Sequence, residues 1–400
     1  MSSQQRLFRG MRVVGTLPVG SPSQYQGPPP RFGKPKEVAC FSRDSSRAVH
    51  FDRRALRDYT PPPLPVALDD GFASYVPKDN ADEPAPLADV FAALAAQKQP
   101  VQPGQIVTFR NNLNKLMATP YAPSDDWEIG VHRQPGGVLE LQVRETERRQ
   151  REEAARDERS RRMCYWGYSF EQACTAGRAA AAAAAPRAGE YRVPSPSDPE
   201  SFAHLYSSSR LEELRRRYGR ERGGGGGGGG GVNANEEFCA VMKLELEQVR
   251  LFMAAEIDCR AGEPAEYVEL KTSKLLEKPR DKASFERHKL LKFWLQSFLA
   301  GVPRVVVGFR DEAGVVRKLQ AFKTLEIPRL VRAQGVWDPS VCLNFGRVVL
   351  EWVVEQVRRL PGAPRLLLRY EPAQNELLLV EEEGAEEESG HVGVKRARIE

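Results

Sequence analysis

The stretch AAEIDCRAGEPAEYVELKTSK, residues 254–274, contains two short segments typical of strands, joined by a linker with glycine and proline. The charged residues of interest are three carboxylates and one lysine: Glu256, Asp258, Glu269 and Lys271. Residues two apart in a strand share a face, so each segment presents two of these charges on one side. The linker CRAGEPAE is short enough for a hairpin-like connection. Pairing the segments through Ile257, Val268 and Leu270 gathers all four charges on one face of a sheet.

Two explanations fit this charged face. A polar, solvated face is common in antiparallel hairpins. However, three neighbouring carboxylates repel one another, and a divalent cation relieves that repulsion. Hard oxygen ligands favour Mg²⁺ or Mn²⁺ over zinc or copper. An acidic residue, a short gap and then Glu-x-Lys also match the core signature of PD-(D/E)xK-type nucleases, in which acids hold metal and the lysine orients water or stabilises charge on phosphate.

Composition sets wider limits on the function. The 400 residues include 59 Lys and Arg against 54 Asp and Glu, and the resulting charge of +5 is too small to indicate a nucleic-acid-binding protein by itself. No apolar run is long enough to span a bilayer, and the N-terminus lacks the apolar core of a signal peptide. The six cysteines show no C-x-x-C spacing and the five histidines form no ligand pair. We therefore expect a reducing intracellular compartment and no zinc site.

Changes in composition along the chain predict its domain organisation. We expect a disordered N-terminus over residues 1–23, a single catalytic nuclease domain over 24–380 and a charged disordered tail over 381–400. An alanine run and a glycine run mark residues 176–231 as a flexible insertion within that domain. Near its end the tail contains the short basic segment VKRAR, which is either a nuclear-import signal or part of a solvated tail. We expect the protein in the nucleus, with the cytoplasm as an open alternative.

Hydrophobic periodicity predicts the local structure. The expected elements are extended chain over 26–65, a helix over 85–95, an apolar-spaced segment over 106–117, a strand over 137–143, a solvated helix or linker over 144–162, a helix over 284–300, a hairpin of 304–309 with 315–319, and a helix over 342–360. In the segment 284–300 one broad face is apolar, while Lys289, Lys292 and Gln296 form a polar stripe whose default interpretation is a solvated surface. Gly301 and Pro303 follow as stop signals.

Six segments occur in a family-specific order: RRMCYWGYSFEQ, VNANEEFCAV, EIDC, YVELKTSK, ERHKLLKFWLQSFLAGVPRVVVGFRD and WDPSVCLNF. Together they resemble the DXO family of decapping exoribonucleases, which act in RNA 5′-end quality control. The resemblance covers roughly residues 24–370 apart from the insertion, and the combined motifs are highly specific. It implies an α+β (mixed α/β) fold, in which two mainly mixed β-sheets with a PD-(D/E)xK-nuclease-like core form a deep groove flanked by helices.

The resemblance also implies roles at matching positions. The implied metal ligands are Glu171, Glu256, Asp258, Glu269 and the carbonyl of Leu270, and the implied catalytic residues are Glu256, Asp258, Glu269 and Lys271. The implied substrate-binding residues are Arg47, Arg110, Asn111, Cys239, Glu256, Lys271 and Gln296. From the residues alone, Glu171 is a surface glutamate that opens a helix, Arg110 pairs with a nearby acid and Cys239 is a small buried hydrophobe. Phe109, Tyr165 and Trp166 either stack on bases or belong to the core.

The activity that the resemblance implies is hydrolysis of RNA 5′ ends with two divalent cations, Mg²⁺ or Mn²⁺. It comprises decapping of incompletely capped and NAD-type capped RNA, 5′-triphosphate pyrophosphohydrolysis and 5′–3′ exoribonuclease action. We expect a monomer that binds RNA 5′ ends and no membrane, and we leave open an exoribonuclease partner. A metal-dependent DNA nuclease and a non-catalytic protein that stabilises another exoribonuclease are the alternatives.

Overall fold

The computed structural model describes residues 12–78, 87–175 and 232–382. Within these residues, ten strands form the larger of two sheets, in the order β1-β15-β14-β6-β7-β5-β9-β8-β2-β3. Their bounds are β1 (Arg12–Pro18), β2 (Lys36–Arg43), β3 (Val49–His50), β5 (Ile106–Phe109), β6 (Trp127–Arg133), β7 (Leu139–Arg144), β8 (Glu237–Leu246), β9 (Val249–Glu256), β14 (Arg365–Glu371) and β15 (Glu376–Glu381). Most neighbours are antiparallel, but β5 pairs parallel to both β7 and β9, so the sheet is mixed.

The second sheet has the order β10-β11-β12-β13-β4 among the described residues. Its strands are β4 (Val66–Ala67), β10 (Cys259–Ala261), β11 (Glu266–Lys274), β12 (Arg304–Arg310) and β13 (Val315–Lys323). Strands β11 and β12 run parallel and the others antiparallel. The hairpin β12–β13 was predicted from the sequence and is confirmed, and two mixed sheets with flanking helices confirm the α+β fold class.

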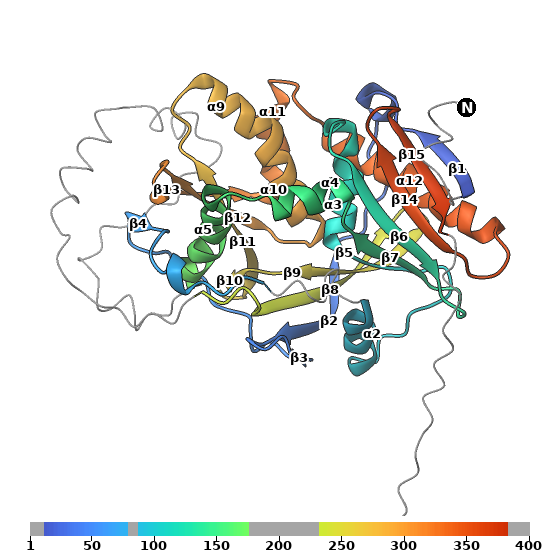
Figure 1. The fold of residues 1–400 in the computed structure, drawn as a ribbon, viewed down its shortest axis with the longest axis horizontal. Coiled ribbons are helices and arrows are strands. Elements are labelled where there is room, and N and C mark those ends of the chain that lie inside the picture. The colour runs from blue at the N-terminus through green and yellow to red at the C-terminus, as the bar shows by residue number, and fades with distance from the viewer. Residues whose placement is uncertain (1–11, 79–86, 176–231, 383–400) are drawn as a thin grey trace, which may run out of the picture.

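Helices cover both sheets (Figure 1). They are α2 (Leu87–Ala96), α3 (Arg110–Ala118), α4 (Glu147–Ala154), α5 (Glu158–Thr175), α9 (Pro279–Ser284), α10 (Leu290–Leu299), α11 (Ile327–Arg332) and α12 (Pro339–Arg359). The main core joins apolar residues of α3, α10 and α12 to one face of the larger sheet and to β12. Helix α2 packs on the opposite face of the larger sheet, and α5 packs on the second sheet. Among the residues that the structure describes, no helix is both long and apolar enough to cross a membrane.

The predicted helix over 284–300 is longer and less regular than its pattern indicates. It runs from α9 through one π-helical turn, Phe285–Lys289, into α10. The ring of Phe285 lies 5.5 Å from the ring of Phe309, so the turn is fixed against the second sheet. Gly301 has φ +66°, a left-handed conformation that suits glycine and ends the helix where the stop signals placed it.

The prediction that residues 1–23 are disordered is wrong for the part that the structure describes. Arg12–Pro18 form β1, which pairs antiparallel with β15 at the edge of the larger sheet, and Pro22–Tyr25 form a short 3-10 helix. The segment has little apolar periodicity because it is an edge strand with mostly exposed side chains, and its order comes from distant β15. Residues 1–11, the insertion over 176–231 and the tail from residue 383 lie outside the described residues.

Candidate active site

The acidic residues of the opening stretch come from two sheets, not from one hairpin. Glu256 is the last residue of β9 in the larger sheet. The chain then leaves that sheet through buried Ile257, and Asp258 directly precedes β10 of the second sheet. The hairpin between β10 and β11 is confirmed, with Cys259 opposite Val268. The predicted pairing through Ile257 is wrong, because Ile257 packs in the main core while Val268 packs under α5.

Hydrogen bonds fix the side chains that follow the crossing. Asp258 Oδ2 accepts a bond of 2.6 Å from the backbone N–H of Leu270. The N–H and C=O of one strand residue point to the same side, so the Leu270 carbonyl also faces the side where Asp258 lies. Lys271 Nζ lies 2.5 Å from Glu269 Oε1 and 3.8 Å from Asp258 Oδ2. The lysine is therefore shared by two carboxylates.

Fully buried Glu269 is surrounded by donors. Besides Lys271, Gln296 Nε2 donates to Glu269 Oε1 at 2.5 Å and Arg110 Nη1 to Glu269 Oε2 at 3.2 Å. Gln296 thus points from α10 into the site, and the default interpretation of its helix face as solvated is wrong at this position. The contact between Arg110 and Glu269 is an ion pair, as expected for Arg110 from the residues alone.

Glu171 lies near the end of α5, where the side chain lines the same groove as Glu256 and Asp258. The interpretation of Glu171 as a surface glutamate that opens a helix is wrong, because α5 already begins at Glu158 within the charge run. The apolar residues around Glu171, such as Phe170 and Cys174, are buried against the second sheet. The helix is therefore anchored on both sides of the carboxylate.

The cluster contains more negative charge than its surroundings neutralise. Burial, together with the Asp258 carboxylate, raises the pKa of Glu171 well above its ordinary value. Burial and neighbouring Glu269 raise the pKa of Asp258 from 3.8 to about 7. Glu256 is exposed to the groove, yet loss of bulk hydration in the groove and nearby Glu237 raise its pKa. A cation bound among these carboxylates would relieve the mutual repulsion that contributes to their raised pKa values.

Glu269 and Lys271 behave in the opposite way. Burial alone would raise the pKa of Glu269, but Lys271 and Arg110 hold it below its ordinary value. Burial alone would lower the pKa of Lys271, but Glu269 and Asp258 raise it. These two residues therefore form a charged pair at neutral pH, beside carboxylates that are harder to ionise.

The donor set fits a hard divalent cation, because it consists of carboxylate oxygens and the Leu270 carbonyl on the side of Asp258. As the side chains stand, however, no group of three or more acidic, histidine or cysteine residues in the described segments could hold an ion together. Glu269 is engaged by Lys271, Gln296 and Arg110, and Asp258 by Leu270. Ion binding therefore requires side chains to reorient within the cluster.

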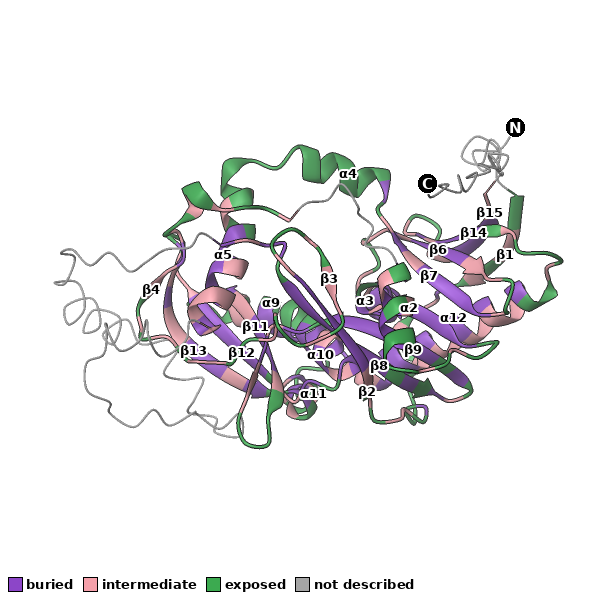
Figure 2. Ribbon diagram, turned by 90° about the horizontal axis from the view of Figure 1, so that it is seen from below, coloured by how far each residue is buried: buried purple, intermediate pink, exposed green. Residues whose placement is uncertain are grey.

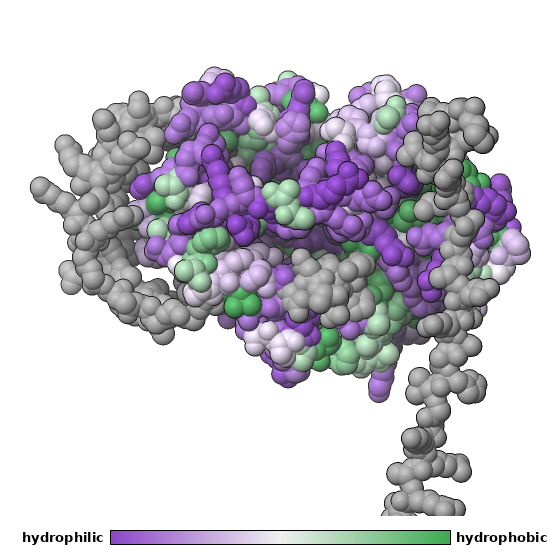
Figure 3. Space-filling model, viewed as in Figure 1, coloured by the Kyte–Doolittle hydropathy of each residue, from purple (hydrophilic) through white to green (hydrophobic). Residues whose placement is uncertain are grey.

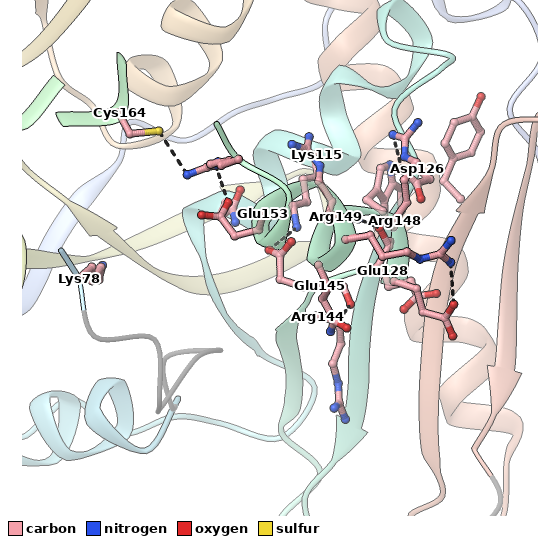
Figure 4. A pocket seen from close by; sticks show the side chains of 18 of the residues that line it. Lys78, Lys115, Asp126, Glu128, Arg144, Glu145, Arg148, Arg149, Glu153 and Cys164 are labelled. Carbon is pink, nitrogen blue, oxygen red and sulfur yellow. Dashed lines mark hydrogen bonds and ion pairs between the residues drawn. The ribbon is translucent and has the colours of Figure 1, made fainter. Parts of the chain in front are cut away.

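The cluster lies in a groove of about 1930 Å³. Hydrophilic side chains surround the middle of the face seen in Figure 3. Away from the cluster, cationic and acidic side chains line the groove together, among them Lys115, Arg144, Arg148 and Arg149 beside Asp126 and Glu145 (Figure 4). Helix α4 has no buried residue and arches between α5 and the strands β6 and β7 (Figure 2). The predicted solvated segment after residue 144 is therefore confirmed, and it forms one rim of the groove.

The other expected substrate-binding residues divide into two groups. Asn111 lines the groove with Arg110. Cys239 is 4% exposed and packs in the core cluster under α2, opposite Glu256 in the strand register, so it is a small buried side chain. Arg47 lies in the turn between β2 and β3 and does not line the groove.

Of the aromatic candidates, Tyr165 and Trp166 are buried in the core under α5, so for both the core alternative holds over base stacking. Phe109 is half-buried against the core under α2. Lys78, Tyr168 and Glu237 are three further residues of this region that were not predicted as site residues. Lys78 and Tyr168 line the groove, while Glu237 is a buried acid at the start of β8. Tyr168 and Glu237 lie within the quoted segments RRMCYWGYSFEQ and VNANEEFCAV, whereas no motif marks Lys78. No local spacing shows that the three side chains meet, because their contacts form only in the folded chain.

Carboxylates and a lysine where two mixed sheets meet, beside a polar groove, are the arrangement of a PD-(D/E)XK-type nuclease. The family model described as RAI1 like PD-(D/E)XK nuclease matches residues 33–200 and 201–394. The decapping and exoribonuclease protein of Homo sapiens is 34% identical over 90% of this chain and 84% of its own length. The decapping nuclease RAI1 of Emericella nidulans is 31% identical over 92% of this chain and 93% of its own length.

Among solved structures, Candida albicans Rai1 in complex with pU5-Mn²⁺ matches with a TM-score of 0.68, 23% identity and coverage of 92% of this chain and 93% of that one. At this identity the likeness concerns the fold. The chain belongs to the RAI1-like PD-(D/E)XK nuclease family, and it is a hydrolase of the decapping nuclease class.

Proposed function

We propose that this protein removes defective or non-standard structures from RNA 5′ ends with divalent cations. Its reactions are decapping of incompletely capped and NAD-type capped RNA, pyrophosphohydrolysis of 5′-triphosphates, and 5′–3′ exoribonuclease action. The observation that carries the proposal is that Glu171, Glu256, Asp258 and Lys271 line one groove, with buried Glu269 paired to Lys271 directly behind them. A cluster of acids this close has a large electrostatic cost without a cation.

Each residue has a distinct part in the proposal. Lys271, kept charged by its carboxylate neighbours, binds a phosphate oxygen or orients the attacking water. Arg110 and Gln296 hold Glu269 ionised and in place. Glu171, Asp258, Glu256, Glu269 and the Leu270 carbonyl are the ligands for two Mg²⁺ or Mn²⁺ ions. When bound, the ions supply Lewis acidity toward phosphoryl oxygens and lower the pKa of a coordinated water.

The substrate class follows from the names of the relatives and from the groove. Relatives of at least 31% identity are named as decapping nucleases, and the groove is long enough to extend well beyond the acidic cluster. Asn111 and Arg110 lie where a phosphate chain would enter the cluster. We place Arg47 and Cys239 outside direct contact with this path, although both were expected to bind substrate. We further propose a monomeric protein located in the nucleus.

The test is mass spectrometry of the products from RNAs that differ only at the 5′ end: triphosphate, unmethylated cap and NAD cap. We expect the wild type with Mn²⁺ to release the matching 5′ group from at least one RNA, and the Asp258→Asn variant to release none. A matched single-stranded DNA is the second arm. Cleavage of DNA with no reaction on any RNA would favour a DNA nuclease, and no product from either would favour a stabilising partner of another nuclease.

A further inference from the structure

A buried chain of charges lies beside the acidic cluster and is not explained by the roles above. Arg43, at the end of β2, stands opposite Glu237 of β8 in the strand register. Both side chains are only 3% exposed, and the guanidinium bonds both Glu237 Oε1 and, at 2.6 Å, Asp89 Oδ2. Glu237 Oε2 accepts a second bond, 2.8 Å long, from Lys78 Nζ. Arg43 therefore fixes Glu237, and Glu237 in turn fixes Lys78.

The chain of charges ends at the groove. Glu237 is two residues before Cys239, and Cys239 stands opposite Glu256 in the register of β8 and β9. Lys78, which is labelled in Figure 4, lines the groove together with Glu256 and Asp258. Its side chain is 24% exposed. Lys78 and Glu237 are both close enough to Glu256 to influence its pKa in opposite directions. The Lys78 ammonium is thus held at the edge of the acidic cluster, on a loop that is separate from β11, the strand of Lys271.

Stability gives little reason for this arrangement. A buried ion pair contributes little net stability, because desolvation offsets the attraction between the charges. Glu237 also adds negative charge next to carboxylates that already repel one another. Arg43 already pairs with Glu237 through Oε1, and Lys78 adds a second cation at Oε2. What Lys78 gains from Glu237 is a fixed position for a compact positive charge, the form in which lysine binds phosphate.

We propose that Lys78 is a substrate-positioning residue that binds a phosphate of the RNA 5′ end, and that the buried pair of Arg43 and Glu237 orients it. The phosphate is then held between Lys78 on a loop and Lys271 on β11, which sets where the 5′ end stops in the groove. The proposal rests on the proposed RNA 5′-end function, and it adds a binding residue to that site.

The first test is equilibrium binding of 5′-phosphorylated single-stranded RNA by fluorescence anisotropy, in the catalytically blocked Asp258→Asn background. Adding Lys78→Met should weaken binding about tenfold, the loss of about 1.4 kcal/mol expected for one charge-assisted contact. The slope of log affinity against log salt should fall by about 0.7, because one phosphate contact to a single strand is lost. RNA with a 5′-hydroxyl should bind equally to both proteins. Lys243 is an exposed lysine of β8, and Lys243→Met is the matched control. It should change neither the RNA affinity nor the salt slope.

The second test separates orientation from structure. In the otherwise wild-type enzyme, Lys78→Met should raise KM about tenfold and change kcat less than twofold. Glu237→Gln should raise KM by a smaller factor, and the double variant should be no worse than Lys78→Met alone, because Glu237 acts through Lys78. The proposal would be overturned if Lys78→Met left the RNA affinity, the salt slope and the melting temperature unchanged. It would also be overturned if Lys78→Met and Glu237→Gln had additive effects on KM. Absence of hydrolysis by the wild type refutes the RNA hydrolase function, whereas the binding test still decides the role of Lys78.

Discussion

Replacing Asp258 with Asn should stabilise the metal-free protein at neutral pH. In the folded state the Asp258 pKa is about 7 against an ordinary value of 3.8, mainly because of burial and the Glu269 carboxylate. The difference of about 3 units at 1.36 kcal/mol each sets a ceiling of about 4 kcal/mol on the cost of the ionised side chain. Asn keeps an oxygen to accept the bond from Leu270 N–H. Neighbouring carboxylates share the cost of the ionised cluster, so removing one charge recovers only part of it. We expect the free energy of unfolding to rise by about 1 kcal/mol or more, which corresponds to roughly 2 °C in Tm.

The pH dependence has a definite sign. Between about pH 4 and pH 7 the folded protein keeps a proton on Asp258 that the unfolded chain has released, so wild-type stability falls as pH rises through this window. The Tm difference between Asp258→Asn and wild type, measured in EDTA by differential scanning fluorimetry, should therefore grow from pH 4 to 7 and then level off. Glu266→Gln, an exposed acid on β11, is the control and should show no such trend. A difference that is flat with pH, or that shrinks toward pH 7, would refute the electrostatic account of the cluster.

Three further predictions concern other parts of the chain. Gln296→Ala removes one donor from Glu269 and should lower kcat/KM about tenfold without unfolding the protein; steady-state kinetics at wild-type values would contradict this. Gly308→Ala should lower stability by about 1–3 kcal/mol, because its Cβ would lie 2.6 Å from the Phe170 ring, whereas Gly136→Ala, with open space around it, should be neutral in the same melting experiment. Deleting residues 176–231 and bridging the ends should leave hydrolysis largely intact, since their composition cannot supply a core; a soluble but inactive deletion protein would disprove this.

Local patterns in the sequence predicted much of the architecture. Period-two and helical spacing located the hairpin β12–β13, the helix ending before Gly301 and the strand β11 with Glu269 and Lys271 on one face. The break between Ile257 and Asp258 was not predictable in this way. Alternation continues through it, while the chain passes from one sheet to the other. Which sheet a strand joins depends on residues far apart in the chain, and hydrophobic periodicity reports only local structure.

Only part of the candidate site could be predicted from local sequence patterns. The acids and Lys271 were found because they repeat within one short stretch. Glu171 was placed by resemblance, since nothing local distinguishes a glutamate inside a helix from a solvated one. Lys78 and Glu237 are 159 residues apart in the chain and meet only after folding, so no local signal identifies their contact.

The most direct test of the central claim is the rate of RNA hydrolysis by Asp258→Asn at saturating Mn²⁺, measured beside its affinity for the same 5′-phosphorylated single-stranded RNA. If the acidic cluster is the active site, hydrolysis should be lost while affinity changes little, because Arg110, Lys271 and the rest of the groove still bind phosphate. Turnover close to that of the wild type would contradict the account and place the chemistry elsewhere in the protein.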